Sequence, residues 1–233
     1  MTLQSSERLL SGELVVEGRL VDASNATLFA KIVTDESVEL AVVYKPIAGE
    51  RPLWDFPDGN LASREVASYL ISEAGGFHCV PTTVMREGPF GIGAVQQWIV
   101  IDENIDFIEL GQSSEPSIRN IALFDVVVNN TDRKFGHILP ISRREVYGCD
   151  HGVTFHEEFK LRTVIWQFAG SLLNDEEKEK LSLVRGFISE SATLTELLTE
   201  IEIAAIIQRI QTLESEGFPQ PSDQWPAVPW PPV

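Results

Sequence analysis

Basic residues are scarce in this chain of 233 residues, which carries 18 lysines and arginines against 35 aspartates and glutamates. The resulting net charge of -17 argues against a nucleic-acid partner, because phosphate backbones select for surfaces rich in Lys and Arg. The same charge disfavours docking on an anionic membrane surface. We therefore expect no nucleic-acid partner, and we rank lipids last among the molecules that the chain would recognise.

Cysteine and long hydrophobic runs are also scarce. The two cysteines, Cys79 and Cys149, lie inside apolar segments and are too few for a disulfide framework, so buried free thiols are favoured over a disulfide. No stretch reaches the roughly 18 consecutive apolar residues of a transmembrane helix, and residues 1–10 lack the apolar region of a signal peptide. We expect a soluble, cytoplasmic protein without integral membrane association.

The overall composition is that of a globular protein. Hydrophobic residues make up 43% of the chain and charged residues 23%, which argues against wholesale disorder. A chain of this length buries a substantial core, as one large domain or as two compact lobes. No internal repeat is visible.

The first part of the chain alternates apolar and polar residues as strands do. We expect strands at 13–20, 28–33, 40–46, 80–87 and 94–100, with a glycine-rich turn at 88–93. A helix is expected at 61–71, because Gly59-Asn60 precedes it and Gly75-Gly76 stops it. The pattern predicts an antiparallel sheet with one helix.

The later part of the chain is expected to be mainly helical. The predicted elements are a helix around 118–127, short strands at 137–141 and 145–149, and helices at 162–171, 175–189 and 193–214. The segment 217–233 holds six prolines, so it cannot be helix or sheet interior. We expect it to be extended and to pack on the body through Trp225 and Trp230.

Two acidic residues follow apolar runs in the middle of the chain. Asp132 ends the run that begins at Phe124, and Asp150 precedes His151-Gly152. Moving a phosphoryl group requires one carboxylate to orient the acceptor hydroxyl, another on a divalent ion, and a cation near the developing charge. Asp132, Asp150 and Lys134 can fill these roles in that order.

The run Phe-Asp-Val-Val-Val-Asn-Asn-Thr-Asp-Arg at 124–133, followed by Asp-His-Gly at 150–152, resembles the catalytic core of the phosphatidylinositol 3/4-kinase-like group. Type II phosphatidylinositol 4-kinases are most similar, and HipA and Fam20 kinases are more distant. The resemblance implies an α+β, two-lobed protein-kinase-like fold. We expect a small antiparallel β N-lobe at 1–101, a mainly helical C-lobe at 102–216 and a tail at 217–233.

The resemblance also assigns an ATP site and a metal site. It implies that the polar turn with Ser24, Asn25 and Thr27 contacts the phosphates, although a plain hairpin turn remains open. Lys45 would bind phosphates and pair with Glu65, unless both are ordinary surface charges. The remaining assignments are Asp132 and Lys134 as catalytic residues, Trp98 and Ile99 at the adenine hinge, where Trp98 could instead be a core residue, and Asp150 as a ligand of Mg or Mn.

One position departs from the kinase pattern. Five residues after Asp132, where these kinases usually place a metal-binding asparagine, this chain has His137. Imidazole suits manganese or zinc better than magnesium, so His137 marks an altered metal preference, a contact to substrate, or reduced catalysis. We hypothesise a manganese preference. Asp125, seven residues before Asp132, is expected to support the loop, and Arg133 to brace it.

These observations predict an ATP-dependent phosphotransferase that acts on an unidentified hydroxyl acceptor, with protein or small molecule favoured over lipid. Two alternatives remain open at this stage. The chain could be a nucleotide-binding pseudokinase or regulatory protein without phosphotransfer, which the histidine at position 137 supports. It could also transfer AMP on the same fold.

Overall fold

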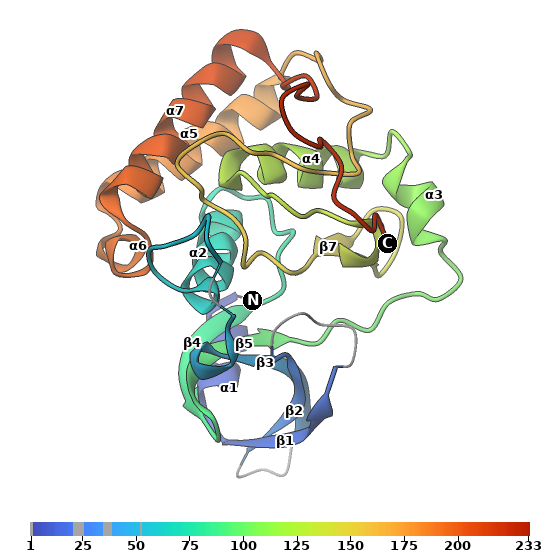
Figure 1. Cartoon of the computed structure of the whole chain (residues 1–233). Coiled ribbons are helices and arrows are strands. Elements are labelled where there is room, and N and C mark those ends of the chain that lie inside the picture. Colours follow the sequence, from blue (N-terminus) through green and yellow to red (C-terminus); the bar gives the residue numbers. More distant parts are fainter. Residues whose placement is uncertain (1, 21–25, 35–38, 52) are drawn as a thin grey trace.

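The computed structural model describes residues 2–20, 26–34, 39–51 and 53–233. Figure 1 shows the small sheet and α1 (Thr2–Leu10) together in the lower part of the view, a larger helical part above them, and α2 (Leu61–Ala74) between the two parts. The expected α+β architecture, with an antiparallel sheet lobe and a mainly helical lobe, is confirmed. Helix α1 was not predicted from the sequence.

The sheet has five antiparallel strands in the order β1-β2-β3-β5-β4. Alternating apolar residues such as Ala30, Ile32 and Val42 face a buried cluster on one side of it. This pattern explains why the first three predicted strands are confirmed almost to the residue. The strands are β1 (Glu13–Arg19), β2 (Leu28–Val33), β3 (Glu39–Pro46), β4 (Thr83–Gly88) and β5 (Gly91–Gln97).

The turn between β4 and β5 is tighter than predicted. Gly88 pairs with Gly91, so only two residues form the turn, and the expected loop at 88–93 is wrong in length. A Cβ on Gly93 would lie 2.4 Å from the Lys45 carbonyl oxygen of β3. The absence of a side chain at Gly93 therefore allows β3 and β5 to approach each other closely, and it is not needed for a loop conformation.

Helix α2 begins where the sequence predicts. The Asn60 side chain accepts a hydrogen bond from the Ser63 backbone N–H at 2.7 Å, and Gly76 follows the helix at a positive φ of 70°. The Glu50 carboxylate, from the loop after the short 3-10 helix Ile47–Gly49, accepts from the Leu61 and Ala62 N–H groups. The amino end of α2 is thus fixed at the boundary between the two lobes.

The helical lobe is built around α4 (Pro116–Val128), whose second half is almost wholly buried. A 3-10 helix, Phe135–His137, and the two-stranded sheet of β6 and β7 follow it. The remaining elements are α3 (Phe107–Gly111), β6 (Ile138–Pro140), β7 (Val146–Gly148), α5 (Asp175–Glu190), α6 (Ala192–Leu197) and α7 (Glu200–Glu216). The short helix α3 was not expected.

Two helix predictions in this lobe are wrong. The segment 162–171 is not a helix, because its backbone pairs with the loop 129–134 that follows α4: the Arg162 N–H donates to the Asn130 carbonyl, and the Val164 N–H to the Arg133 carbonyl. The single helix expected at 193–214 is broken after Leu197. Thr199 and Glu202 form a capping box that starts α7 afresh.

The tail at 217–233 forms neither helix nor strand, but it bends at several points rather than running extended, and it packs only partly through its tryptophans. The Trp225 indole N–H donates to the Leu161 carbonyl at 3.4 Å, whereas Trp230 is 85% exposed. The expected packing of Trp230 is therefore wrong. Figure 1 shows the carboxyl end near β7, and the Pro232 carbonyl accepts from the Phe135 N–H at 2.9 Å.

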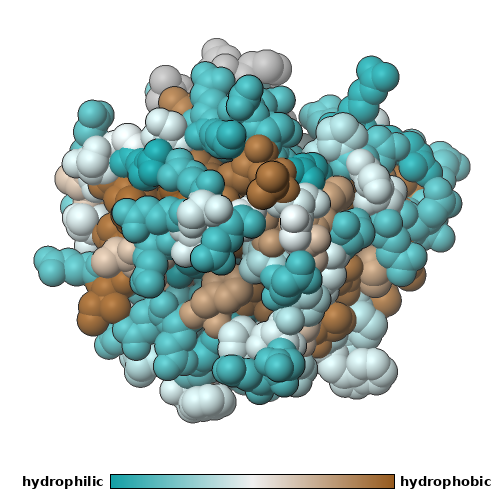
Figure 2. All heavy atoms as spheres, turned by 90° about the horizontal axis from the view of Figure 1, so that it is seen from above, coloured by the Kyte–Doolittle hydropathy of each residue, from teal (hydrophilic) through white to brown (hydrophobic). Residues whose placement is uncertain are grey.

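The surface of the molecule seen from above, on the side of the helical lobe, is mostly hydrophilic, with apolar groups scattered between polar ones (Figure 2). Isolated apolar residues on a surface are ordinary. Among the described residues, no helix has the length and apolar composition needed to cross a membrane. Cys79 and Cys149 are both free thiols, as predicted.

Candidate active site

Two adjoining pockets lie in the cleft between the lobes. One, of about 160 Å³, is lined by residues that include Glu65, Asp132 and Lys134. The other, of about 440 Å³, is lined by residues that include Trp98 and Ile99. Both pockets share Thr27, Lys45, His137 and Asp150.

The structure therefore brings together all the predicted site residues that it describes. Ser24 and Asn25 lie outside the described residues. Sequence reasoning missed Glu50 and Gly152 in the smaller pocket, and Gln96 and Cys149 in the larger one. The only sequence signal for Glu50 was its place a few residues after Lys45, which is weak.

Lys45 is the cation that links the two lobes. It lies on β3, forms a close ion pair with the buried Glu65 of α2, and donates to Asp150 Oδ1 at 2.9 Å. Burial disfavours the charged amine, but the carboxylates of Asp150 and Glu65 outweigh it and raise the pKa of Lys45. The strand lysine and helix glutamate thus pair as predicted, and the lysine is charged.

The loop 129–134 is held by a buried ion pair behind it. Asn129, the residue after α4, adopts a left-handed conformation, and Asn130 Oδ1 then accepts from the Asp132 N–H at 3.0 Å. Arg133 donates two hydrogen bonds of 2.8 Å to the Asp125 carboxylate, and both side chains are fully buried. These contacts agree with the supporting roles expected for Asp125 and Arg133.

Arg133 also reaches the second acidic segment. It donates to the Cys149 carbonyl at 2.9 Å and to His151 Nε2 at 2.8 Å. Burial lowers the pKa of His151, so its imidazole is neutral and can accept this bond. Arg133 therefore fixes the segment that carries Asp150 relative to the loop that carries Asp132.

Asp132, His137 and Asp150 each offer a ligand atom, and these atoms lie within 4.8 Å of one another. His137 Nε2 is 3.6 Å from Asp150 Oδ2. Burial lowers the pKa of His137, and the Lys45 amine is the largest cause holding the pKa of Asp150 well below its usual range. A neutral imidazole and two carboxylates are ligands that fit a divalent cation.

The larger pocket has apolar side chains on its walls, among them Val43, Trp98 and Leu139. The Trp98 ring contacts Phe29 edge to face at 5.1 Å between centroids, and its backbone N–H donates to Ala41. Trp98 is 38% exposed, so it lines the cleft rather than the core.

The chain has a protein-kinase-like fold. The solved structure of hydra Fam20 with sugar superposes with a TM-score of 0.55 at 12% identity, over 93% of this chain and 88% of that one. The Golgi casein kinase with Mn/ADP bound gives a TM-score of 0.54 at 12% identity, over 93% and 75%. At this identity the likeness concerns the fold alone.

The sequence itself has a much nearer relative. Protein Rv2133c of Mycobacterium tuberculosis (strain ATCC 25618 / H37Rv) is 37% identical, over 99% of this chain and 97% of that protein. The chain therefore belongs to the same family as Rv2133c. No family model matches the sequence. The predicted relation to Fam20 kinases is confirmed for the fold, whereas the closer relation to type II phosphatidylinositol 4-kinases and HipA stays a prediction.

Proposed function

We propose that this protein is an ATP-dependent phosphotransferase that transfers the γ-phosphoryl group to a hydroxyl. The observation that carries the proposal is the convergence of Asp132, His137 and Asp150 beside the Lys45–Glu65 pair in the cleft. These side chains come from both lobes and from distant parts of the sequence. Phosphoryl transfer needs this combination of carboxylates and cations in one place.

Each residue then has a chemical role. Asp132 orients the acceptor hydroxyl and receives its proton, while Lys134, whose Nζ is 3.2 Å from Asp132 Oδ2, faces the charge that develops on the transferred group. Lys45 binds the α- and β-phosphates and Glu65 positions it. Thr27 lies beside the phosphates, and Trp98 and Ile99 border the adenine.

Asp150 and His137 are the proposed metal ligands, and Asp132 stands within reach of the same ion. A divalent ion, when bound there, neutralises charge on the phosphates. The Golgi casein kinase, whose fold is similar, has Mn and ADP in its structure, which supports a nucleotide with manganese or magnesium here. The lobe boundaries at 1–101, 102–216 and 217–233 and the phosphatidylinositol 3/4-kinase-like classification belong to the same proposal.

The acceptor is a protein or a small molecule rather than a lipid. The net charge of -17 would repel an anionic membrane surface, where a phosphoinositide-type substrate resides. The acceptor hydroxyl must reach Asp132, which is about one-third exposed at the cleft.

Thermal stability with ATP tests the nucleotide site directly. ATP at about 100 times its dissociation constant, with magnesium or manganese, should stabilise the wild-type protein by about 2.7 kcal/mol. For a chain of this size that is a shift of about 5 to 10 °C. Asp150→Asn should lose the metal-dependent part of the shift, whereas Asp223→Asn, a matched change in the exposed tail, should keep it. No shift with either metal would refute the nucleotide site.

Turnover separates phosphotransfer from its alternatives. Wild-type protein with ATP and metal should hydrolyse ATP slowly or phosphorylate itself, and Asp132→Asn should reduce that turnover at least about 100-fold while keeping the ATP-dependent thermal shift. The mass added to any product tells a phosphoryl group from an AMP group. Binding without turnover in the wild type, unchanged by Asp132→Asn, would identify a nucleotide-binding regulatory protein instead.

A further inference from the structure

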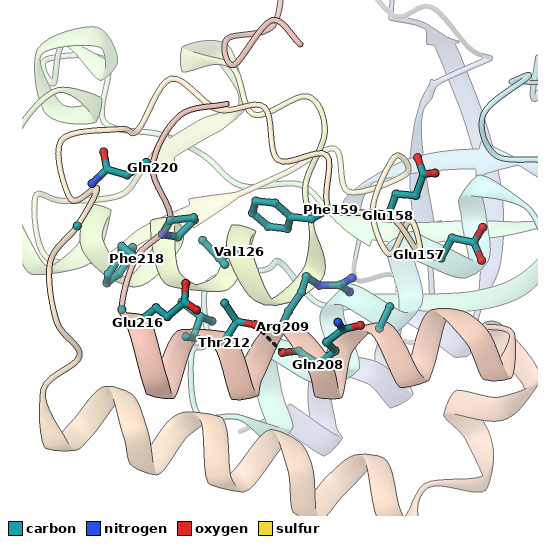
Figure 3. A pocket seen from close by; sticks show the side chains of 15 residues that line it. Val126, Glu157, Glu158, Phe159, Gln208, Arg209, Thr212, Glu216, Phe218 and Gln220 are labelled. Atoms are coloured by element: carbon teal, nitrogen blue, oxygen red, sulfur yellow. Dashed lines mark hydrogen bonds between the residues drawn. The ribbon is translucent and has the colours of Figure 1, made fainter. Parts of the chain in front are cut away.

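Two parts of the molecule combine a cavity with a buried polar side chain. One is a pocket of about 730 Å³ in the helical lobe, which shares no lining residue with the two cleft pockets. Figure 3 shows Arg209 of α7 in its wall, and this side chain donates to the backbone carbonyls of Val127 and His156. The other is the larger cleft pocket, where the amide of Gln96 is held in one orientation and one of its atoms is free.

Gln96 lies on the face of the sheet that borders the cleft. It is opposite Val43 of β3 on one side and Thr83 of β4 on the other, and it is only 5% exposed. Lys45 lies two residues farther along β3 on the same face, about 7 Å from Val43. Val43, Lys45, Gln96 and Trp98 all line the larger pocket. Gln96 therefore lies between the phosphate-binding end of the cleft that we propose and the Trp98 end.

The Thr83 hydroxyl fixes the orientation of the Gln96 amide. Thr83 Oγ1 donates its single proton to the Pro81 carbonyl at 2.8 Å, so toward Gln96 it can only accept. Gln96 therefore turns its Nε2 toward Thr83 and donates to Oγ1 at 2.9 Å. The other amide atom, Oε1, accepts no hydrogen bond from the described residues and is not among their fully enclosed polar atoms without a partner. It is thus an acceptor left open to the pocket.

A fixed acceptor in an apolar wall discriminates between ligands. It gains a hydrogen bond from a ligand N–H, whereas a ligand oxygen in the same place leaves two acceptors facing each other without a proton between them. Purine bases differ in this respect at position 6: adenine carries an amino group, which donates, and guanine carries an oxo group, which accepts. The orientation of Gln96 therefore matches adenine.

We propose that Gln96 selects the base of the nucleotide: its Oε1 accepts a hydrogen bond from the 6-amino group of adenine and disfavours 6-oxo purines. Thr83 is the positioning residue, because its hydroxyl keeps the amide from turning over. The inference rests on the proposed function, in which the phosphates lie at Lys45 and the base extends past Gln96 toward Trp98. It adds the side chain that decides which nucleoside triphosphate serves as the phosphoryl donor.

Calorimetric titration of the full chain with ATP and with inosine triphosphate, each with saturating manganese, tests the proposal. The two ligands share the ribose, the phosphates and the metal, so the ratio of their dissociation constants reports on the base alone. The wild type should bind ATP at least about tenfold more tightly. Gln96→Met, which keeps the size of the side chain without the acceptor, should lower this ratio at least about fivefold. Gln211→Met, the same change at an exposed position of α7, should keep it.

Thr83→Val provides a second, independent test, because Thr83 lines neither cleft pocket. Without the hydroxyl the Gln96 amide can turn over and offer Nε2 to a 6-oxo group, so inosine triphosphate should bind at least about threefold more tightly than to the wild type. Equal affinities in the wild type, or a ratio unchanged in either variant, would overturn the assignment and leave the nucleotide site in place. No binding of either nucleotide would refute the site and the assignment together.

Discussion

Arg133 is the buried residue that connects the loop 129–134 with the segment that carries Asp150. Its buried guanidinium joins Asp125 on α4, the Cys149 carbonyl and His151, so it ties together the segments that carry the two acidic site residues. A Cβ at Gly148 would lie 2.9 Å from Arg133 Nη2. The glycine before Cys149 therefore leaves the space that the guanidinium needs.

The metal preference of the site is predicted to depend on His137. Because burial lowers the pKa of His137, its imidazole is neutral and available as a ligand, and imidazole favours manganese over magnesium. We expect half-maximal ATP-dependent stabilisation at a lower concentration of manganese than of magnesium. His137→Asn should reduce this preference by about tenfold, the scale on which changes around a metal site act.

Titrations of the wild type and of His137→Asn with each metal, at saturating ATP, measure the preference. His156→Asn is the control, since His156 lines neither pocket of the cleft. Equal action of both metals in the wild type, unchanged in His137→Asn, would exclude the histidine as a selective ligand.

At this scale the sequence predicted the residues that belong to a local motif. Asp132, Lys134 and Asp150 follow apolar runs, and Lys45 and Glu65 occur in the order strand, then helix, so pattern and resemblance sufficed. Glu50 and Arg209 could not be found in this way. Their partners, the amino end of α2 and the carbonyls of Val127 and His156, are defined only by the folded chain.

At the scale of elements, sequence periodicity predicted the helices and strands that bury a regular apolar face. It failed for segments whose conformation is set by hydrogen bonds to backbone groups distant in the sequence. The strands of the sheet and α2, α4 and α5 follow from alternation, helical spacing and caps. Residues 162–171 are apolar enough for a helix, yet the N–H groups of Arg162 and Val164 donate to the carbonyls of Asn130 and Arg133 instead. The break between α6 and α7 carries a local signal, the Thr199–Glu202 capping box, which the longer apolar stripe obscured.

The stability of the protein is predicted to depend on Asn60, which caps the amino end of α2. Asn60→Ala removes the side chain that accepts from the Ser63 N–H, and should destabilise the protein by about 1 kcal/mol. Asn60→Gly should cost only a few tenths of a kcal/mol, because glycine is tolerated at this position. Urea unfolding of the three proteins measures the difference. Equal stability of Ala and wild type would mean that Glu50 alone caps the helix.

On the scale of the whole molecule, one ion-pair cluster spans the cleft. Lys45 belongs to the sheet, Glu65 to the helix between the lobes, and Asp150 to the helical lobe, so the cluster connects all three. A movement that opens the cleft would break the Lys45–Asp150 contact first, because Asp150 is half exposed whereas Glu65 is buried. The geometry of the proposed metal site is therefore coupled to the separation of the lobes.

The tail at 217–233 forms a second set of long-range contacts, and its loss is predicted to destabilise the helical lobe. The Ala227 carbonyl accepts from the Thr163 N–H and the Trp166 indole, and the Pro232 carbonyl accepts from the Phe135 N–H. With the bond from the Trp225 indole to the Leu161 carbonyl, four hydrogen bonds join 225–233 to the helical lobe. At about 1 kcal/mol each, their loss on deletion of 225–233 should destabilise the protein by about 4 kcal/mol and lower its melting temperature by about 8 to 16 °C.

The matched control is Trp230→Ala, which removes a large apolar side chain that is 85% exposed and should change stability by no more than about 0.5 kcal/mol. Since the Phe135 N–H lies three residues after Asp132, the deletion should also lower phosphotransfer more than nucleotide binding. Differential scanning fluorimetry and turnover measure the two effects. A deletion that leaves both unchanged would mean that the tail does not hold the catalytic loop in solution.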